Sequence, residues 1–318
     1  MSSDVIVTVT LNAALHVAYT ADDPAPDGIT PVSRPRYRAG GRGVTVARVL
    51  RAFGHDVLAA GLAGGASGEL IIQDLAKSGV PTAFTLIRGE SRRLLRFAAP
   101  DPGGPALRFG EPGPYITTEE LGRFAADYRR LMAGAAAVVL CGSLPDGLPA
   151  DTYGSLVTYA AEAGVPVILD AGGEELKHAV GHGPDLVVAE SGSSEPGPGA
   201  LGETLVRLGA GAAAVAADGL VRAVTPDGAW TARVARAGGP DPAHPPARGA
   251  LVAGLVPGQL LGWSWPDRLR HALALAAGGV GAWTAQAGGP EERDRVNLAE
   301  YERLLDAVRV EPPDGDPR

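Results

Sequence analysis

The feature that most constrains this chain is the alternation of short apolar runs with stretches of helical period. The β-branched run "DVIVTVTLN" (4–12) precedes a helical stretch at 44–53. Three more apolar runs, at 135–145, 165–173 and 184–191, also alternate with helical segments. Repeated units of this kind form a mainly parallel sheet with helices on both faces. The sequence therefore predicts a three-layer α/β/α core.

Two segments, at about 13–38 and 84–110, interrupt this pattern. They contain strand-like runs joined by turns rich in Pro and Gly, and they lack helical period. We expect them to form a small antiparallel β lid over the mouth of the main sheet, because open parallel sheets bind ligands beyond the carboxyl ends of their strands. The rest of 1–310 is expected to be one α/β domain. The polar tail, 311–318, is expected to be disordered.

Composition excludes several functional classes. The net charge of −8 argues against a nucleic-acid-binding surface. The single cysteine, Cys141, excludes an intramolecular disulfide and a Cys-rich metal site, and we predict no metal ligands. The N-terminal residues lack a signal-peptide pattern, and no apolar run is long enough to cross a bilayer. We therefore expect a cytoplasmic protein without a nucleic-acid or membrane partner.

Two arginine-bearing motifs are candidates for anion binding. In "AGGRGVTVAR" (39–48), glycines surround Arg42 just before a helix. The N–H groups and dipole of a helix start favour an anion, and a guanidinium can bind phosphate through two hydrogen bonds. In "ESRRLLR" (90–96), Arg92 and Arg96 share one face of a strand. A flexible turn with a surface arginine, and an edge strand protected by charge, remain open as alternatives.

Two later motifs place polar groups at the ends of predicted elements. "CGSLPDG" (141–147) follows a buried strand, so Ser143 lies either in a ligand site or in a plain β-to-α turn. We expect Cys141 to be a buried strand residue rather than a nucleophile. "HPPARGALVAGLVPG" (244–258) predicts a helix start at which Arg248 meets the positive end of the helix dipole. That position is unfavourable unless an anion or water screens the charge.

Taken in order, these motifs resemble those of the phosphofructokinase-B family of ribokinase-like sugar kinases, over residues 5 to about 308. Within the family, the motifs are most similar to those of 1-phosphofructokinases and tagatose-6-phosphate kinases. The matching stretches are "TVTLNAALHVAYT" (TxTLNPALDxxY), "GGRGVTVARVLRAFGHDV" (GGKGxNVAxxLxxLGxxV), "GESRRLLR" (GExRxNxK), "CGSLPDGLPADTY" (SGSLPxGLPxDxY) and "LDAGGEEL" (LDxSGExL).

The resemblance implies a ribokinase-like fold that transfers the γ-phosphoryl group of ATP to a sugar or sugar phosphate. It also implies a homodimer through the lid strands. The family motif GAGD supplies an anion hole and an Asp base at a helix start, and here it aligns with "PARG" (246–249). Gly249 thus stands at the base position and has no side chain to reach a proton. ATP and Mg²⁺ are implied as cofactors only if the chain is an active kinase.

The family motifs also suggest where a ligand would bind. His16, Thr45 and Leu94 stand where the family has Asp, Asn and Asn. The predicted substrate-binding residues are Asn12, His16, Gly40, Gly41, Arg42, Thr45, Arg92, Arg96 and Ser143. Weaker nucleotide-side candidates are Glu190, Asp218 and Gly219.

Three hypotheses follow from these departures. The first is an impaired or inactive pseudokinase that keeps a pocket for a small phosphorylated sugar or related anion. The second is an active hexose-phosphate kinase with a displaced base, for which Asp241, Glu190 and Asp170 are candidates and Arg248 is a weak catalytic candidate. The third is isomerisation or hydrolysis through His16 or His244. Loss of a general base alone costs about 10²–10⁴-fold in rate, whereas loss of the surrounding electrostatic groups costs more.

Overall fold

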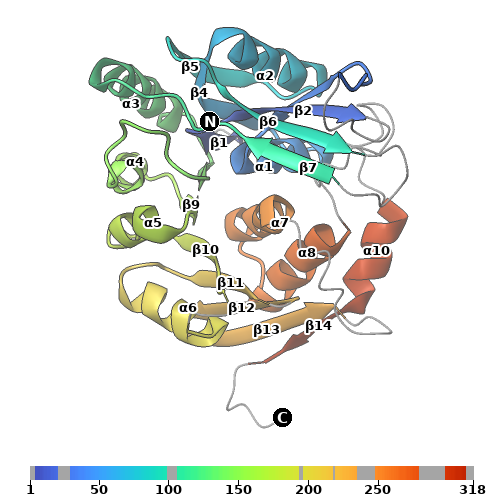
Figure 1. Cartoon of the computed structure of the whole chain (residues 1–318). Helices are drawn as coiled ribbons and strands as arrows, with labels where there is room; N and C mark the ends of the chain where they lie inside the picture. Colours follow the sequence, from blue (N-terminus) through green and yellow to red (C-terminus); the bar gives the residue numbers. More distant parts are fainter. Residues whose placement is uncertain are drawn as a thin grey trace.

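The computed structural model describes residues 4–20, 29–98, 106–192, 196–217, 219–234, 248–278 and 298–312. It confirms the predicted three-layer α/β/α core (Figure 1). The strands are β1 (Ile6–Thr10), β2 (Ala14–Thr20), β3 (Arg36–Gly40), β4 (Val57–Gly64), β5 (Thr82–Ile87), β6 (Arg92–Ala98), β7 (Ala106–Gly110), β8 (Ala137–Cys141), β9 (Val167–Asp170), β10 (Leu186–Glu190), β11 (Ala213–Ala217), β12 (Leu220–Thr225), β13 (Gly228–Val234) and β14 (Val308–Glu311). The helices are α1 (Arg42–Ala52), α2 (Gly65–Lys77), α3 (Thr118–Met132), α4 (Thr152–Glu162), α5 (Gly173–Val180), α6 (Pro198–Arg207), α7 (Arg248–Leu261), α8 (Trp265–Ala277) and α10 (Leu298–Ala307).

The main sheet has the strand order β14-β13-β12-β11-β10-β9-β8-β1-β4-β5. Seven neighbouring strands of this sheet, β5, β4, β1, β8, β9, β10 and β11, run parallel to one another. At the other end β12, β13 and β14 pair antiparallel. The chain order reverses beside β1, since β4 and β5 lie on one side of it and β8, β9 and β10 follow on the other. A crevice for ligands forms beyond the strand ends at such a point. Thr10 and Cys141, the last residues of β1 and β8, are paired there.

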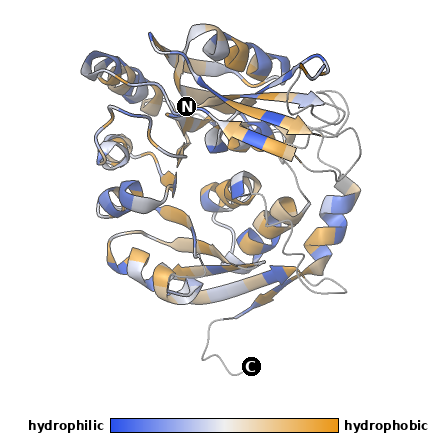
Figure 2. Cartoon of the chain, viewed as in Figure 1, coloured by the Kyte–Doolittle hydropathy of each residue, from blue (hydrophilic) through white to orange (hydrophobic). Residues whose placement is uncertain are grey.

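Apolar residues fill both faces of the sheet. All five residues of β1 are buried, as expected for a central parallel strand covered on both sides. Helices α1, α2, α7, α8 and α10 pack into the core on one face, and α3, α4, α5 and α6 pack on the other. Figure 2 shows the resulting apolar stretches in the strands and the mixed polar and apolar sides of helices such as α3 and α10.

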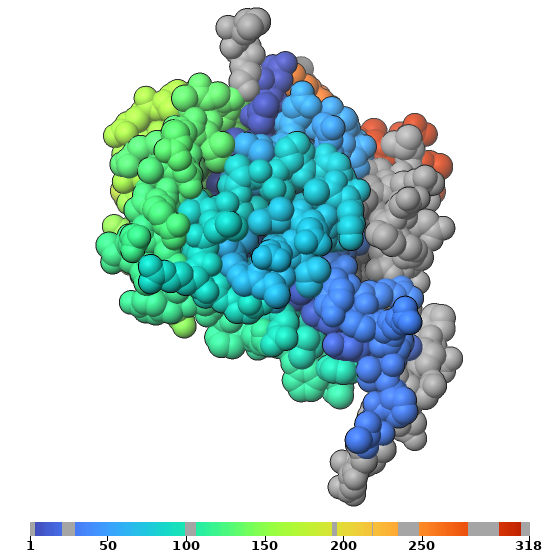
Figure 3. Space-filling model, turned by 90° about the horizontal axis from the view of Figure 1, so that it is seen from above, coloured from blue at the N-terminus to red at the C-terminus, as the bar shows by residue number. Residues whose placement is uncertain are grey.

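The predicted lid is a second sheet with the order β3-β2-β6-β7. The β2–β3 and β6–β7 pairs are antiparallel, whereas the central β2–β6 pair, which joins the two insertions, is parallel. Figure 3 shows the lid segments, in blue and blue-green, projecting from one side of the molecule. On their outer face Tyr37, Leu107 and Phe109 are about half exposed. The homodimer through this sheet stays a prediction, which the molar mass in solution would test.

Two boundaries differ from the sequence-based expectation. Residues 84–87, placed in the lid, belong to β5, which pairs with β4 at the edge of the main sheet. Glu311, placed in the tail, ends β14 opposite Thr231, because the antiparallel extension of the sheet offers that strand a partner. Residues 313–318 lie outside the described part of the chain. None of the described helices is long and apolar enough to cross a membrane.

Candidate functional site

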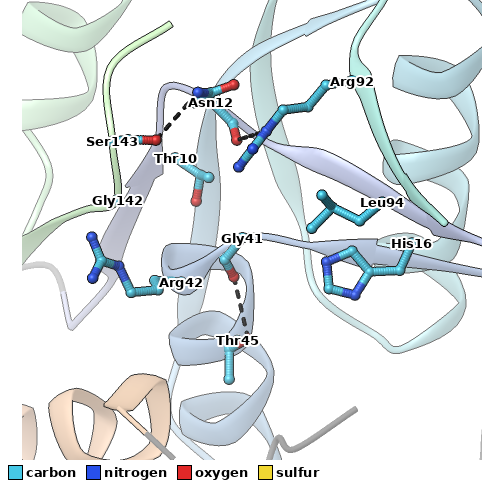
Figure 4. A pocket seen from close by; sticks show the side chains of 10 residues that line it. All are labelled: Thr10, Asn12, His16, Gly41, Arg42, Thr45, Arg92, Leu94, Gly142 and Ser143. Atoms are coloured by element: carbon cyan, nitrogen blue, oxygen red, sulfur yellow. Dashed lines mark hydrogen bonds between the residues drawn. The ribbon is translucent and has the colours of Figure 1, made fainter. Parts of the chain in front are cut away.

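A pocket of about 380 Å³ lies at the reversal point of the main sheet, under the lid (Figure 4). It is bounded by the ends of β1 and β8, the start of α1 and the inner face of β2 and β6. Its volume suits a small metabolite. The lining residues are Thr10, Asn12, His16, Gly41, Arg42, Thr45, Arg92, Leu94, Gly142 and Ser143.

The turn that presents Arg42 is held by a buried ion pair that the sequence analysis did not single out. Arg48 donates to the carbonyl oxygen of Ala39 at 3.0 Å and binds the carboxylate of Asp74. The same carboxylate accepts a hydrogen bond from the Ala39 N–H at 2.7 Å. The position of Arg48 in the sequence could have revealed this pair, because Arg48 is a charged residue one turn after Val44 on the buried side of α1. The pair fixes the end of β3 and hence the start of α1.

Hydrogen bonds connect the lid to the ends of β1 and β8. Arg92 donates from Nε to the carbonyl oxygen of Asn12 at 3.3 Å. The Asn12 amide donates to Ser143 Oγ at 3.2 Å and to the Leu144 carbonyl at 3.4 Å. Within the described ranges, Asn12 Oδ1 is buried without a hydrogen-bond partner. This wall of the pocket therefore carries a half-buried guanidinium, whereas Asn12 Oδ1 is enclosed beside Gly113.

The part of the lid next to Arg92 carries no charge near neutral pH. His16 of β2 and Leu94 of β6 are paired across the lid and both line the pocket. Burial, and then the positive charges of nearby arginines, lower the pKa of His16 to about 4. His16 therefore adds no positive charge to the pocket at physiological pH, because its imidazole is neutral there.

The low pKa values of His16 and His271, each about 4, predict acid sensitivity. Both values lie below the unfolded-state value of about 6.5, so the unfolded chain binds more protons between pH 6.5 and 4. The free energy of unfolding is expected to fall as the pH falls through this window, by about 1.4 kcal/mol per pH unit for each histidine. Urea denaturation at pH 7 and pH 5 would measure the loss, which should be smaller in His271→Phe. An equal loss in the two proteins would contradict this account.

A buried carboxylate at the end of β9 binds two arginines. Asp170 is fully buried; Arg248 Nη2 lies 2.6 Å from its Oδ1, and Arg42 Nε lies 3.3 Å from its Oδ2. Burial raises the pKa of Asp170, and the positive charges of Arg248 and Arg42 oppose that shift. Arg248 also donates to the carbonyl oxygens of Ala171 at 3.3 Å and Val188 at 3.1 Å.

Arg248 is the first residue of α7, where the positive end of the helix dipole disfavours a cation, and the carboxylate of Asp170 compensates its charge. Its Nη1 lies 3.5 Å from Glu190 Oε2, and the Glu190 side chain is 60% exposed. The two carboxylates that end β9 and β10 are both engaged by this one guanidinium. Neither of them lines the pocket.

The second residue of α7 abuts α1. A Cβ on Gly249 would lie 2.8 Å from Thr45 Cγ2, 2.9 Å from Thr45 Cβ and 3.5 Å from the carbonyl oxygen of Arg42. Real Cβ contacts are longer than the first two distances, so a side chain at 249 requires α1 and α7 to move. Gly249 faces the residues of the pocket rim, and the packing there excludes a larger residue.

Comparison with known proteins identifies the family. A model of the pfkB family of carbohydrate kinases matches residues 7–191, which is more than half of the chain. This protein belongs to the pfkB family. The matched range contains every residue that lines the pocket and ends before α7.

Individual relatives agree with this assignment. A tagatose-6-phosphate kinase of Staphylococcus epidermidis is 35% identical over 175 residues, which are 55% of this chain and 56% of that protein. The match therefore spans only a little more than half of that relative. Among solved structures, a possible 1-phosphofructokinase of Thermotoga maritima superposes with a TM-score of 0.80 at 21% identity, covering 97% of this chain and 99% of the other.

A second solved structure shows the same fold. Phosphofructokinase-2 of Escherichia coli, in complex with fructose-6-phosphate, superposes with a TM-score of 0.77 at 23% identity. The alignment covers 96% of this chain and 99% of that one. The ribokinase-like arrangement predicted from the motifs is thereby confirmed.

In this pfkB-family protein the pocket contains most of the predicted substrate residues. Gly40 and Arg96 do not line it: the His16 ring packs against Gly40, and Arg96 lies farther along β6. Three lining residues were outside the predicted set, and they are Thr10, Leu94 and Gly142. Thr10 could have been found as the last residue of the central strand, where ligands of such sheets bind.

The other residues considered in the sequence analysis lie outside the pocket or outside the described part of the chain. Asp218, Asp241 and His244 lie outside the described residues. Gly219 lies in the turn between β11 and β12 with φ 77°. Cys141 is fully buried, and burial raises the pKa of its thiol well above the ordinary value, so the prediction that it is no nucleophile agrees with the structure.

Proposed function

We propose that this pfkB-family protein binds a small phosphorylated sugar or a related anion and transfers no phosphoryl group at a kinase rate. One observation carries the proposal. The pocket is lined by two arginines, and none of its lining residues in the described part of the chain is a carboxylate. Guanidinium groups suit phosphate recognition. A phosphotransferase of this family is expected to place an Asp beside the acceptor hydroxyl.

Further features of the pocket support a polar, anionic ligand. The start of α1 has Gly41 at its N-cap and no side-chain cap, so the first N–H groups of the helix remain available to an anion. Thr10 and Ser143 add hydroxyl groups to the lining. Such a site fits a phosphosugar better than an apolar molecule.

Among the residues that the structure describes, no carboxylate lines the pocket as a substitute for the base. Asp170 is buried between Arg248 and Arg42, and Glu190 is directed to Arg248. His16 is neutral near pH 7, and a group with a pKa of about 4 is a weak base. Asp241 lies outside the described residues, so the displaced-base kinase remains the alternative that the following assay decides.

The residues around α7 do not suit a nucleotide with Mg²⁺. Asp170 and Glu190, the carboxylates close to the start of α7 in the described part of the chain, could have faced a metal ion, but both are paired with Arg248. The proposal therefore includes no step through ATP or Mg²⁺.

Calorimetry and a coupled phosphotransfer assay test the proposal together. Titration with fructose 1-phosphate, fructose 6-phosphate and tagatose 6-phosphate is expected to give saturable binding to at least one sugar. Incubation of each sugar with ATP and Mg²⁺ is expected to give no turnover beyond a trace. That trace should be the same in Arg42→Met and Asp241→Asn, which would identify it as a contaminant. Turnover that disappears in either variant would show an active kinase and overturn the proposal.

Restoring an acid at position 249 is not expected to restore activity. Gly249→Asp places a Cβ within 3 Å of Thr45, so we expect a loss of about 1–3 kcal/mol from overpacking and no gain in turnover. Urea denaturation would measure the first effect and the coupled assay the second. Kinase activity in Gly249→Asp without a loss of stability would show that the site tolerates the family base.

A further inference from the structure

Helix α2 joins the lid to the main domain. It contacts β4 of the main sheet and also β2 and β3 of the lid, and Figure 1 shows it beside β2. Ile71 and Leu75 on its inner side are buried in the core. Polar groups of the same helix form hydrogen bonds with residues at the ends of two lid strands. We call each of these two polar contacts a latch.

The first latch lies on the edge strand of the lid. In the described lid, β3 is the outer strand next to β2. The carboxylate of Asp74, in α2, accepts the Ala39 N–H, and the guanidinium of Arg48 donates to the Ala39 carbonyl oxygen. Both backbone groups of Ala39 are thus bound as a further strand would bind them. The side chains of Arg48 and Asp74 are 6% and 18% exposed, so water competes little for these bonds.

The second latch lies at the first turn of α2. Gly64 is the N-cap and provides no side-chain cap. Glu90, which precedes β6, instead accepts hydrogen bonds from the N–H groups of Ala66 at 3.1 Å and Ser67 at 2.7 Å. Ser91 and Gly64 exchange two further hydrogen bonds, at 2.9 and 3.0 Å. Hydrogen bonding from Ser67 lowers the pKa of Glu90, so its carboxylate is ionised at neutral pH.

Each latch lies close in sequence to an arginine of the pocket. Arg42 comes three residues after Ala39, and Arg92 comes two residues after Glu90. The two latches are about 10 Å apart along α2, because a helix rises 1.5 Å per residue. Helix α2 therefore sets the spacing between the strand that leads to Arg42 and the strand that begins with Arg92.

Strand pairing connects the two latches through the lid itself. Residues 14–20 of β2 pair with 92–98 of β6 along their whole length, and β3 pairs with β2 on the other side. A displacement of β3 is therefore transmitted to β6. We expect the lid to move as one unit when it leaves α2.

We propose that α2 positions the lid over the pocket through these two latches, Asp74 on β3 and Glu90 before β6, and that the lid opens as a unit when they release. Asp74 and Glu90 are positioning residues, since neither lines the pocket. A ligand that contacts both Arg42 and Arg92 would join α1 to the lid and hold it closed. This last step rests on the proposed function, whereas the latches do not.

Hydrogen exchange of the ligand-free protein tests the latches. The segments to follow are 36–40 in β3 and 92–98 in β6, over exchange times at which 137–141 in β8 stays protected. Asp74→Asn is expected to speed exchange in both lid segments by about tenfold or more, because a buried guanidinium loses its charged partner. Glu90→Ala is expected to speed it by about fivefold, the usual effect of losing a helix cap. Wild-type exchange of the lid in both variants would overturn the proposal.

The segment that each substitution does not touch distinguishes one opening from local fraying. Asp74→Asn should speed exchange in 92–98, and Glu90→Ala should speed exchange in 36–40. An effect confined to the strand beside the substituted residue would overturn the opening as a unit. If Asp74→Asn does not fold, Glu90→Ala still decides the question, because Glu90 is exposed.

Two carboxylates outside the latches serve as controls. Glu69 is exposed on α2. Asp127 of α3 accepts a hydrogen bond from Thr85 Oγ1 of β5 at 2.7 Å, at the same edge of the main sheet. Glu69→Gln and Asp127→Asn should leave the exchange of the lid unchanged. Faster exchange of the lid in either control would show that the effect is not specific to the latches.

A double variant separates the latch from a general contribution to stability. Arg48→Met/Asp74→Leu removes both charges of the buried pair, so the free energy of unfolding should return close to the wild-type value. Exchange of the lid should nevertheless stay as fast as in Asp74→Asn, because Ala39 has lost both side-chain partners. Slow, wild-type exchange in the double variant would overturn the first latch.

Fructose 6-phosphate tests whether a ligand holds the lid closed, by calorimetry and by the same exchange measurement. At ten times its dissociation constant, it is expected to slow exchange of 36–40 and 92–98 by about tenfold in the wild type and in Glu90→Ala. Binding in the calorimeter without slower exchange of the lid would overturn closure on the ligand. Absence of binding would count against the proposed function and closure on this sugar, whereas exchange of the ligand-free protein decides the latches in either case.

Discussion

Replacing Arg248 by methionine is expected to lower the free energy of unfolding by about 3–5 kcal/mol, the usual cost of removing one partner from a buried ion pair. Asp170 is fully buried, and Arg248 is its nearer partner at 2.6 Å. Methionine would fill much of the volume but would leave the carboxylate with Arg42 alone, 3.3 Å away. The carbonyl oxygens of Ala171 and Val188 would lose a charged donor as well. Urea denaturation monitored by circular dichroism measures the change.

Two matched variants identify the cause of that loss. Asp170→Asn/Arg248→Met removes both charges of the closest pair, and its stability should recover most of the difference. Glu190→Gln removes the exposed partner, and it should change stability little because exposed ion pairs contribute little. A loss below about 1 kcal/mol in Arg248→Met would mean that Arg42 alone compensates the buried carboxylate. The assignment of Arg248 as the main counter-ion of Asp170 would then be incorrect.

Replacing Gly61 by alanine is expected to destabilise the protein by about 3 kcal/mol or more, from backbone strain and overpacking together. Gly61 lies in β4 with φ 143°, a conformation that side chains disfavour. A Cβ there would lie 2.0 Å from the carbonyl oxygen of Thr10 and 2.7 Å from its carbonyl carbon. Because these are backbone atoms at the end of β1, the strand itself must move. Thr10 lines the pocket, so ligand affinity should fall with stability.

The control for Gly61 is a glycine with open surroundings. Gly79 has φ 69°, and a Cβ there would meet no atom within 4 Å, so Gly79→Ala should cost only about 1 kcal/mol for the left-handed conformation. It should leave ligand binding unchanged. Equal losses in Gly61→Ala and Gly79→Ala, measured by urea denaturation, would refute the role assigned to the contact between β4 and β1.

The general fold could be read from sequence because its signals are local. Runs such as "VIVTVT" are buried on both faces only in a central parallel strand, and their alternation with helical segments leaves few other folds. The parallel pairing of β2 with β6 could not be read in this way. It joins two strands separated by more than 70 residues, and no turn between them sets their register.

For the candidate site, too, the local features could be predicted from sequence and the contacts between distant segments could not. Local motifs predicted Arg42 and Arg92 as candidate anion-binding residues, because a glycine-rich helix start and a strand face are properties of a few consecutive residues. The same motifs could not give the charge of His16, since its pKa depends on burial and on arginines from other segments. They also gave no reason to join Arg248 to Asp170, which lie 78 positions apart and meet only at the ends of β9 and α7.

By itself the sequence determined the layers of the fold, the family and the absence of a side chain at Gly249, because each of these follows from residue type and local period. Only the tertiary structure decided that Thr45 closes the space beside Gly249 and that one buried carboxylate is shared by Arg42 and Arg248. The physical reason is that packing and charge compensation depend on distances between segments far apart in the chain. Those distances are set when α1, α7 and the strand ends come together.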